Sequence, residues 1–210
     1  ENVRPPFAYI PRRLRYLLIS QMRLALEKSD RASLDEQDVV VLNSGSMAHL
    51  YVNVRSEQLD VGEVEALAPD LISQLLSHPG IWLVVGRHRG ETIIMGRNGT
   101  TVVGGSLETE GEDPLAGLPD GVRAAHELAR VAGYPSAGDL LIFGQYDAET
   151  DSVCCFERLW ACHGGLGGAQ VEPFLMGEQG LVGELAQDAG PEDLHAMFWS
   201  RYVAGDSLPS

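Results

Sequence analysis

Apolar residues recur at helical spacing in several stretches of the chain, and polar or glycine-rich segments separate these stretches. In residues 11–29, leucines and a methionine recur on one face while four arginines fall mostly elsewhere, so the pattern predicts an amphipathic helix. Residues 60–77 predict a second helix that starts at Asp60 and breaks at Pro69, because proline cannot donate the helical hydrogen bond. Two more helices are predicted over residues 120–132 and 191–203.

Runs of β-branched and aliphatic residues bounded by turn residues predict the strands. They cover residues 38–43, 49–54, 81–85, 91–95, 100–103, 138–143 and 152–159. The dipeptide Asn98-Gly99 is the strongest hairpin signal in the chain, so residues 81–103 are expected to form a three-stranded meander, a small cap within the domain. Residues 104–120 are rich in glycine and acidic residues with few apolar anchors, which predicts a mobile surface loop.

The mixture of predicted elements and the apolar content of the chain together indicate its fold class. With 210 residues, of which 44% are hydrophobic, the chain can bury a core of its own. We therefore expect a single α/β domain over residues 1–210.

The charge of the chain excludes several classes of partner. Thirty acidic against fifteen basic residues give a formal net charge of −15, and so acidic a surface repels nucleic acids and anionic membranes. There is no apolar run of about 18 residues and no signal-peptide pattern, so the chain is expected to behave as a soluble fragment.

The three cysteines, Cys154, Cys155 and Cys162, point to a reducing compartment, where they are expected to be buried free thiols. Adjacent cysteines in a strand project to opposite faces, which disfavours a disulfide between Cys154 and Cys155. A bridge from either of them to Cys162 is compatible with a hairpin.

Candidate chemistry concentrates in a histidine that ends an apolar run. His163 is followed by four glycines in five residues, namely Gly164, Gly165, Gly167 and Gly168. Glycines permit positive φ angles and the close approach of a ligand or another loop. In a structural interpretation they form a tight connection between strands, and in a functional one the neutral imidazole holds a zinc-like ion beside a phosphate. The stretch alone favours the structural interpretation, because zinc needs three or four convergent ligands.

A wider pattern favours the functional interpretation. The run from Gly138 to Met176 contains Gly138-Asp-Leu-Leu-Ile, His163-Gly-Gly-Leu-Gly-Gly and Pro173-Phe-Leu. It resembles the closing segment of the type I phosphodiesterase and nucleotide pyrophosphatase branch of the alkaline phosphatase superfamily. Together with residues 39–46, it is similar to bacterial membrane-anchored phosphodiesterases, and the likeness runs in order over most of residues 38–176.

The resemblance implies the C-terminal part of a larger metal-dependent phosphodiesterase, with a partial three-layer sheet of the alkaline phosphatase type. His163 would then be one ligand of a centre with two zinc-like divalent ions, and Asp139 would orient a metal-bound histidine unless it merely caps its strand. The cleft would be lined by Gly164, Gly165, Gly167 and Gly168. The substrate would be a small phosphate ester, and upstream segments would anchor the full-length protein in a membrane with this part in the cytoplasm. This chain lacks an Asp-His pair and an early Thr or Ser nucleophile, so alone it is expected to be inactive.

Two other classes of function stay open at this point. One is a non-catalytic α/β interaction module that uses the meander and the terminal helix as contact surfaces, the helix also serving as a homodimer face. The other is a single-zinc site built from His163 and the cysteines. His49, Ser44 and Ser46 receive no catalytic role, because neither serine lies in a nucleophile-elbow pattern.

Overall fold

A computed structural model describes residues 39–157, 162–177, 180, 185–186 and 189–203 of the chain. The chain divides into two compact units, Glu1–Val171 and Glu172–Ser210. The single domain over residues 1–210 stays a prediction. The helix predicted at residues 11–29 lies outside the described residues. The first unit has the expected mixed α/β composition.

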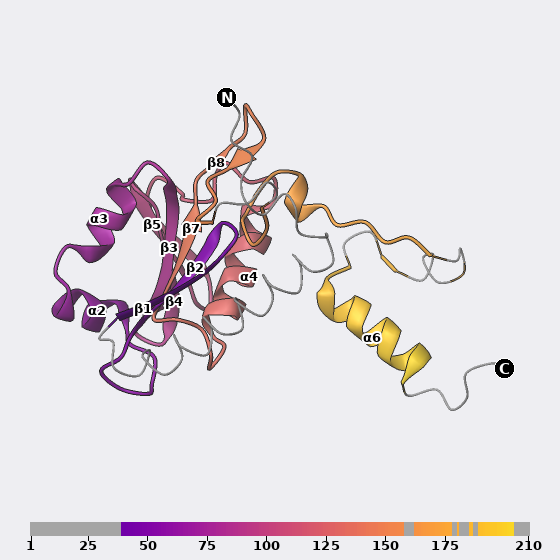
Figure 1. Ribbon diagram of the computed structural model, residues 1–210, viewed down its shortest axis with the longest axis horizontal. Helices are drawn as coiled ribbons and strands as arrows, with labels where there is room; N and C mark the ends of the chain where they lie inside the picture. Colours follow the sequence, from indigo (N-terminus) through magenta and orange to yellow (C-terminus); the bar gives the residue numbers. More distant parts are fainter. Residues whose placement is uncertain (1–38, 158–161, 178–179, 181–184, 187–188, 204–210) are drawn as a thin grey trace, which may run out of the picture. The chain divides into compact units, whose positions relative to one another are not determined.

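The first unit is built on a seven-stranded sheet in which neighbouring strands are antiparallel, in the order β1-β2-β7-β3-β4-β5-β6 (Figure 1). The strands are β1 Val39–Ser44, β2 Met47–Val52, β3 Ile81–His88, β4 Glu91–Met95, β5 Gly99–Val103, β6 Leu107–Gly111 and β7 Leu140–Gly144. The last of these strands along the chain, β7, therefore lies between two strands that precede it.

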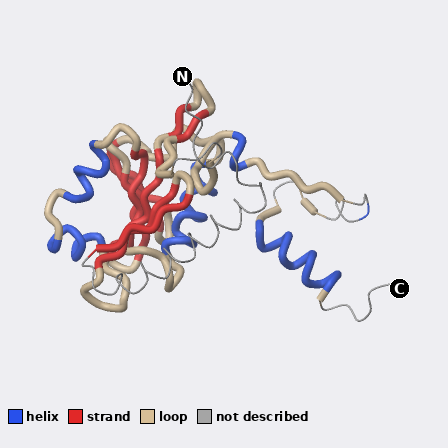
Figure 2. Tube along the Cα trace, viewed as in Figure 1, coloured by secondary structure: helices blue, strands red, loops and turns tan. Residues whose placement is uncertain are grey.

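Helices cover both faces of this sheet (Figure 2). They are α2 Val61–Leu67, α3 Leu71–Ser77 and α4 Gly121–Ala132. Alternate residues of β7 serve the two faces: Leu141 and Phe143 pack in the cluster with α4, while Leu140 and Ile142 pack in the cluster with α2 and α3. Because both faces of β7 are buried, its sequence is a continuous apolar run instead of an alternating one.

The helix boundaries follow the local signals in the sequence. Asp60 accepts a hydrogen bond from the Gly62 N–H at 2.9 Å, and Glu63 accepts one from the Asp60 N–H at 2.8 Å, which together cap the start of α2. The predicted break at Pro69 is confirmed, since α2 ends at Leu67 and α3 begins at Leu71. The start predicted for the helix over residues 120–132 is confirmed as well, because Asp120 caps α4 by accepting from the Arg123 N–H at 3.0 Å.

The prediction of a mobile loop over residues 104–120 is wrong for its first part. Residues Leu107–Gly111 form β6, an edge strand held by backbone pairing with β5. Four of its five residues are exposed, so the strand lacks the apolar alternation by which sequence patterns reveal strands. The rest of the segment is anchored by Leu115, which is only 2% exposed.

The predicted meander forms, and β3 pairs with β7, so its strands continue the central sheet. Its role as a cap stays a prediction. The strand predicted over residues 152–159 is shorter than expected: β9 Ser152–Val153 pairs only with β8 Tyr146–Asp147. Residues 158–161 lie outside the described part of the chain.

The second unit contains the predicted terminal helix, α6 Pro191–Tyr202. None of the residues of α6 is buried. Phe198 and Tyr202 stack on each other along the helix, with ring centroids 6.1 Å apart, and Trp199 is 53% exposed. His195 is exposed.

Candidate functional site

Several turns and strand ends meet at one end of the sheet, which we call the Ser46 end. The register places Ser44 opposite Met47 and Ile81 opposite Gly144, so the β1–β2 turn, the end of β7 and the start of β3 are neighbours. The Gly144 N–H donates to the Ser46 carbonyl at 2.8 Å. The β4–β5 turn and the end of β6 follow at the same end of the sheet.

His163 is fixed to the Ser46 end through its backbone. Its carbonyl oxygen accepts the Ser46 N–H at 2.9 Å and is 3.3 Å from the Ser46 hydroxyl oxygen, which can donate to it. Ser46 itself is fully buried. Gly45 has a φ of +65°, and a β-carbon there would overlap the His163 carbonyl, so the turn requires glycine. The residues that make this contact are 117 positions apart in the chain.

The side chain of His163 is exposed, in contrast to its clamped backbone. Within the described part of the chain, the imidazole makes no hydrogen bond. The structural interpretation, in which nearby backbone satisfies the ring, therefore has no support among the described contacts. The ring is held at a defined place on the sheet and is accessible to a ligand.

Three of the four glycines after His163 take the positive φ angles that the sequence permits. Gly164, Gly167 and Gly168 have φ angles of +78°, +83° and +68°. A β-carbon on Gly165 would overlap the Ser46 hydroxyl. The amide of Gln170 ties the loop together, because it accepts from the Gly165 N–H at 3.3 Å and donates to the Gly167 carbonyl at 3.0 Å.

Two cavities open at this end of the sheet, and each is lined by one ring of an aromatic pair. The rings of Trp82 and Tyr146 are 6.5 Å apart. Tyr146, Gly167 and Gly168 line a cavity of about 170 Å³, and Trp82 lines another of about 360 Å³. Of the four predicted cleft glycines, Gly167 and Gly168 thus line a cavity, while Gly164 and Gly165 shape the loop.

Sequence reasoning missed the aromatic pair, because Trp82 and Tyr146 come from different strands with no motif between them. The Tyr146 hydroxyl lies 3.3 Å from a carboxylate oxygen of Asp151, which also lines the smaller cavity. Burial, and then the negative charge of Asp151, raise the pKa of Tyr146 above its ordinary value. The hydroxyl therefore stays protonated and acts as a donor at neutral pH.

Two cysteines lie against the same turn. The Cys155 thiol donates to the Gly45 carbonyl at 3.3 Å, and the Cys162 thiol lies 3.8 Å from the His163 carbonyl. Burial, and then contact with the Cys155 thiol, raise the pKa of Cys162. The expectation that the cysteines are buried is wrong, because Cys154 is exposed and the other two are half-buried.

The described residues alone do not form a metal centre. Among them, no three His, Cys, Asp or Glu side chains lie close enough together to hold an ion. His163 can supply one donor, and a zinc site needs at least three from the protein. The single-zinc site of His163 and the cysteines therefore gains no support from the contacts in this part of the chain.

Asp139 does not lie beside His163. It precedes β7, whereas His163 is held beyond the far end of that strand, so the two are separated by roughly 15 Å of extended chain. Its carboxylate accepts the Val52 N–H at 2.7 Å and the Leu59 N–H at 2.6 Å. These are the contacts of a strand-start cap, the structural alternative for this residue, and they give Asp139 no part in orienting His163.

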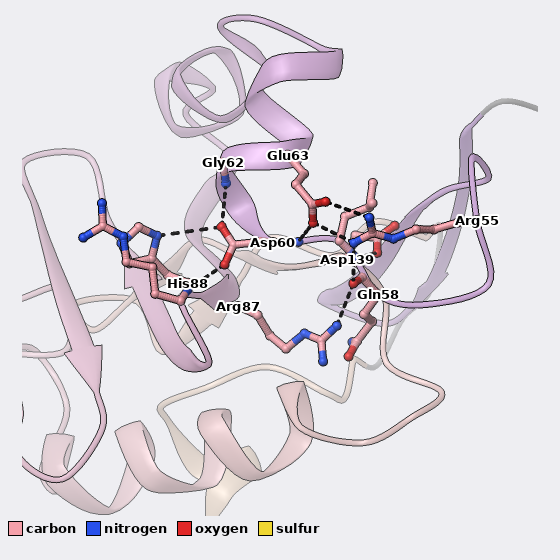
Figure 3. A network of polar contacts seen from close by, with 10 residues as sticks. Arg55, Gln58, Asp60, Gly62, Glu63, Arg87, His88 and Asp139 are labelled. Atoms are coloured by element: carbon pink, nitrogen blue, oxygen red, sulfur yellow. Dashed lines mark hydrogen bonds and ion pairs between the residues drawn. The ribbon is translucent and has the colours of Figure 1, made fainter.

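The opposite end of the sheet carries a polar network that serves the fold (Figure 3). Arg87 donates to the Gln58 carbonyl at 2.7 Å, and the Arg89 N–H donates to Asp60 at 2.6 Å. Arg55 pairs with Glu63 through two contacts of 2.7 Å, and this bond lowers the pKa of Glu63. The network connects the segment between β2 and α2 to β3 and to the start of β7.

His49, to which the sequence assigned no role, also serves the fold. Its Nδ1 accepts the Gly138 N–H at 3.0 Å, and its ring stacks on Tyr51 with centroids 6.1 Å apart. Burial lowers the pKa of His49. The neutral ring is the form that can accept this hydrogen bond.

Comparison with protein-family models, curated proteins and solved structures finds no match to this chain. Within the described ranges, none of the helices has the length and apolar character needed to cross a bilayer.

Proposed function

We propose that the first unit forms one wall of the catalytic cleft of a metal-dependent phosphodiesterase, to which His163 contributes one metal ligand. The observation that carries the proposal is the combination of a clamped backbone and an exposed ring at His163. A ligand on a fixed backbone is preorganised, because few conformations are lost when it binds. The resemblance of residues 38–176 to phosphodiesterases of the alkaline phosphatase superfamily supports the same role.

The chain's own residues contribute position and access in this proposal. The Ser46 turn holds the His163 backbone, and the glycine loop keeps side chains away from the space beside the ring. The remaining metal ligands and the nucleophile would come from elsewhere in a larger protein, whose further strands would complete an alkaline phosphatase-like arrangement. Two bound divalent ions would polarise a phosphoryl oxygen and stabilise the leaving group.

The substrate class and cellular setting belong to the same proposal. The substrate would be a small phosphate ester, and upstream segments would anchor the full-length protein in a membrane. The strongly acidic chain, with its formal net charge of −15, disfavours a nucleic-acid substrate.

The test is hydrolysis of bis(p-nitrophenyl) phosphate by the full-length protein with zinc or manganese present. His163→Ala should lower kcat/KM by roughly 10–100-fold or more and reduce the bound metal, as loss of metal-site residues does. His126→Ala is the matched control, because His126 is exposed on α4. Unchanged activity and metal content in a folded His163→Ala variant would refute the proposal.

A second candidate, a non-catalytic interaction module, rests on α6. Phe198, Trp199 and Tyr202 are 40%, 53% and 54% exposed, and clustered exposed aromatic residues are typical of contact surfaces. Sedimentation of the wild type and of Trp199→Ala tests the homodimer form of this candidate. A monomer at every concentration for both proteins would exclude that dimer.

A further inference from the structure

Two of the three cysteines converge on the β1–β2 turn from different parts of the chain. The Cys155 sulfur is 3.3 Å from the Gly45 carbonyl, and the Cys162 sulfur is 3.8 Å from the His163 carbonyl. That second carbonyl is bound by the N–H of Ser46, the next residue of the turn. Contact with the Cys155 thiol is also one cause of the raised pKa of Cys162. Both sulfur atoms therefore lie beside residues 45–46.

Cys154 projects away from this pair. A β-carbon placed on Gly80, next to the start of β3, would lie 2.9 Å from the Cys154 sulfur. Hydrogen bonds fix the backbone on both sides of Cys155, since the Cys154 N–H donates to Gln145 at 2.7 Å and the Phe156 N–H donates to Gly45 at 2.8 Å. This extended backbone sends successive side chains in opposite directions.

We propose that Cys155 and Cys162 are a modification site, at which an oxidised low-molecular-weight thiol such as glutathione disulfide closes a Cys155–Cys162 disulfide and Cys154 takes no part. Disulfide formation requires β-carbons about 4 Å apart and side chains that face each other. Both thiols lie beside the same two residues of the turn, which favours this arrangement. Both residues are half-buried, so a small oxidant can reach them.

The reaction balances as two successive exchanges. The Cys155 sulfur attacks the disulfide of the oxidant, forms a mixed disulfide and releases one reduced thiol. The Cys162 sulfur then attacks the Cys155 sulfur in that mixed disulfide, forms the internal bond and releases the second reduced thiol. The two cysteines lose two electrons and two protons in total, which the small disulfide gains. This site is independent of whether His163 holds a metal.

The test uses the whole chain carrying Cys154→Ser, incubated with glutathione disulfide and then alkylated. We expect both remaining thiols to be lost to alkylation, with a mass lower by two hydrogen atoms and no attached glutathione. Dithiothreitol should restore both thiols. The matched variant Cys155→Ser retains Cys154 and Cys162 and should form no internal bridge.

Either of two outcomes would overturn the inference. In one, Cys154→Ser keeps both thiols free or carries glutathione on them without an internal bond. In the other, Cys155→Ser forms a Cys154–Cys162 bridge as readily as Cys154→Ser forms its own. Near-ultraviolet circular dichroism checks that each variant is folded, and the result for Cys154→Ser decides the question even if Cys155→Ser does not fold.

Discussion

Replacing Gly45 by alanine tests whether the β1–β2 turn holds His163 in place. Gly45 has a φ of +65°, which costs an alanine about 1–2 kcal/mol. The added methyl group would also overlap the His163 carbonyl. If that carbonyl moves away, the N–H of the fully buried Ser46 loses its acceptor, at a cost of about 1–3 kcal/mol. The sum for Gly45→Ala is roughly 2–5 kcal/mol.

Three further glycines separate the two causes. Gly90 has a φ of +84° with nothing within 4 Å, so Gly90→Ala should show the backbone cost alone, about 1–2 kcal/mol. Gly144 lacks a positive φ but lies against the Cys154 carbonyl, so Gly144→Ala should show the overlap alone. Gly105 has neither feature, and Gly105→Ala should stay within about 0.5 kcal/mol of the wild type.

The assay is urea denaturation followed by tryptophan fluorescence, with the free energy of unfolding compared at equal m-values. The reasoning requires Gly45→Ala to be clearly less stable than Gly90→Ala. If these two variants have the same free energy of unfolding, the contact between the turn and the His163 carbonyl contributes nothing, and the clamped position of His163 is refuted.

Three other outcomes are expected from the described contacts. Asp139→Ala should lower the free energy of unfolding by roughly 2–5 kcal/mol, because two backbone N–H groups lose their acceptor. Asp139→Asn should lower it less. If urea denaturation shows a loss under about 0.5 kcal/mol for Asp139→Ala, the capping role of Asp139 is contradicted. Burial lowers the pKa of His49 below its ordinary 6.5, so as the pH falls the unfolded chain binds a proton at this ring before the folded chain does. The stability that comes from the neutral ring is therefore present above about pH 6.5 and is lost as the pH falls below it. His49→Asn keeps an acceptor for the Gly138 N–H but has no group that titrates in this range. Its stability in thermal unfolding should therefore change less between pH 7 and pH 5 than that of the wild type. If the stability of both proteins depends on pH in the same way, His49 is not the source of the pH dependence. Thr101→Val should lower the free energy of unfolding by about 1–2 kcal/mol, because the buried Thr101 hydroxyl lies 3.0 Å from the Thr109 hydroxyl on β6. An unchanged stability in thermal or urea unfolding would mean that this contact does not anchor β6.

Local features of the fold could be predicted wherever one residue type has a strong local preference. The break at Pro69 and the start of α4 at Asp120 are of this kind. The hairpin at Asn98-Gly99 also forms, but for another reason than the sequence suggested. Gly99 has no positive φ; it is the first residue of β5, and a β-carbon there would overlap the backbone of Glu112. A preference for glycine was visible in the sequence, whereas its cause was a contact with a distant residue.

Features that depend on contacts between distant residues could not be predicted. Nothing in residues 140–144 indicates that β7 pairs with both β2 and β3, although the continuous apolar run shows that both of its faces are buried. At the candidate site, the glycines after His163 were predicted to take positive φ angles, and three of them do. The attachment of His163 to Ser46 was not predicted, because Ser46 carries no motif and lies 117 positions before it.

The central place of β7 has a consequence for how the chain is made. The β1–β2 hairpin and the β3–β6 strands are joined in the sheet only by β7, which is synthesised after all of them. On the ribosome, we therefore expect the inner edges of β2 and β3 to lack their native partner until residue 144 has left the exit tunnel, because that partner is β7. Nascent chains that end shortly before Leu140 should accordingly be far more sensitive to proteases than chains that extend beyond Val171.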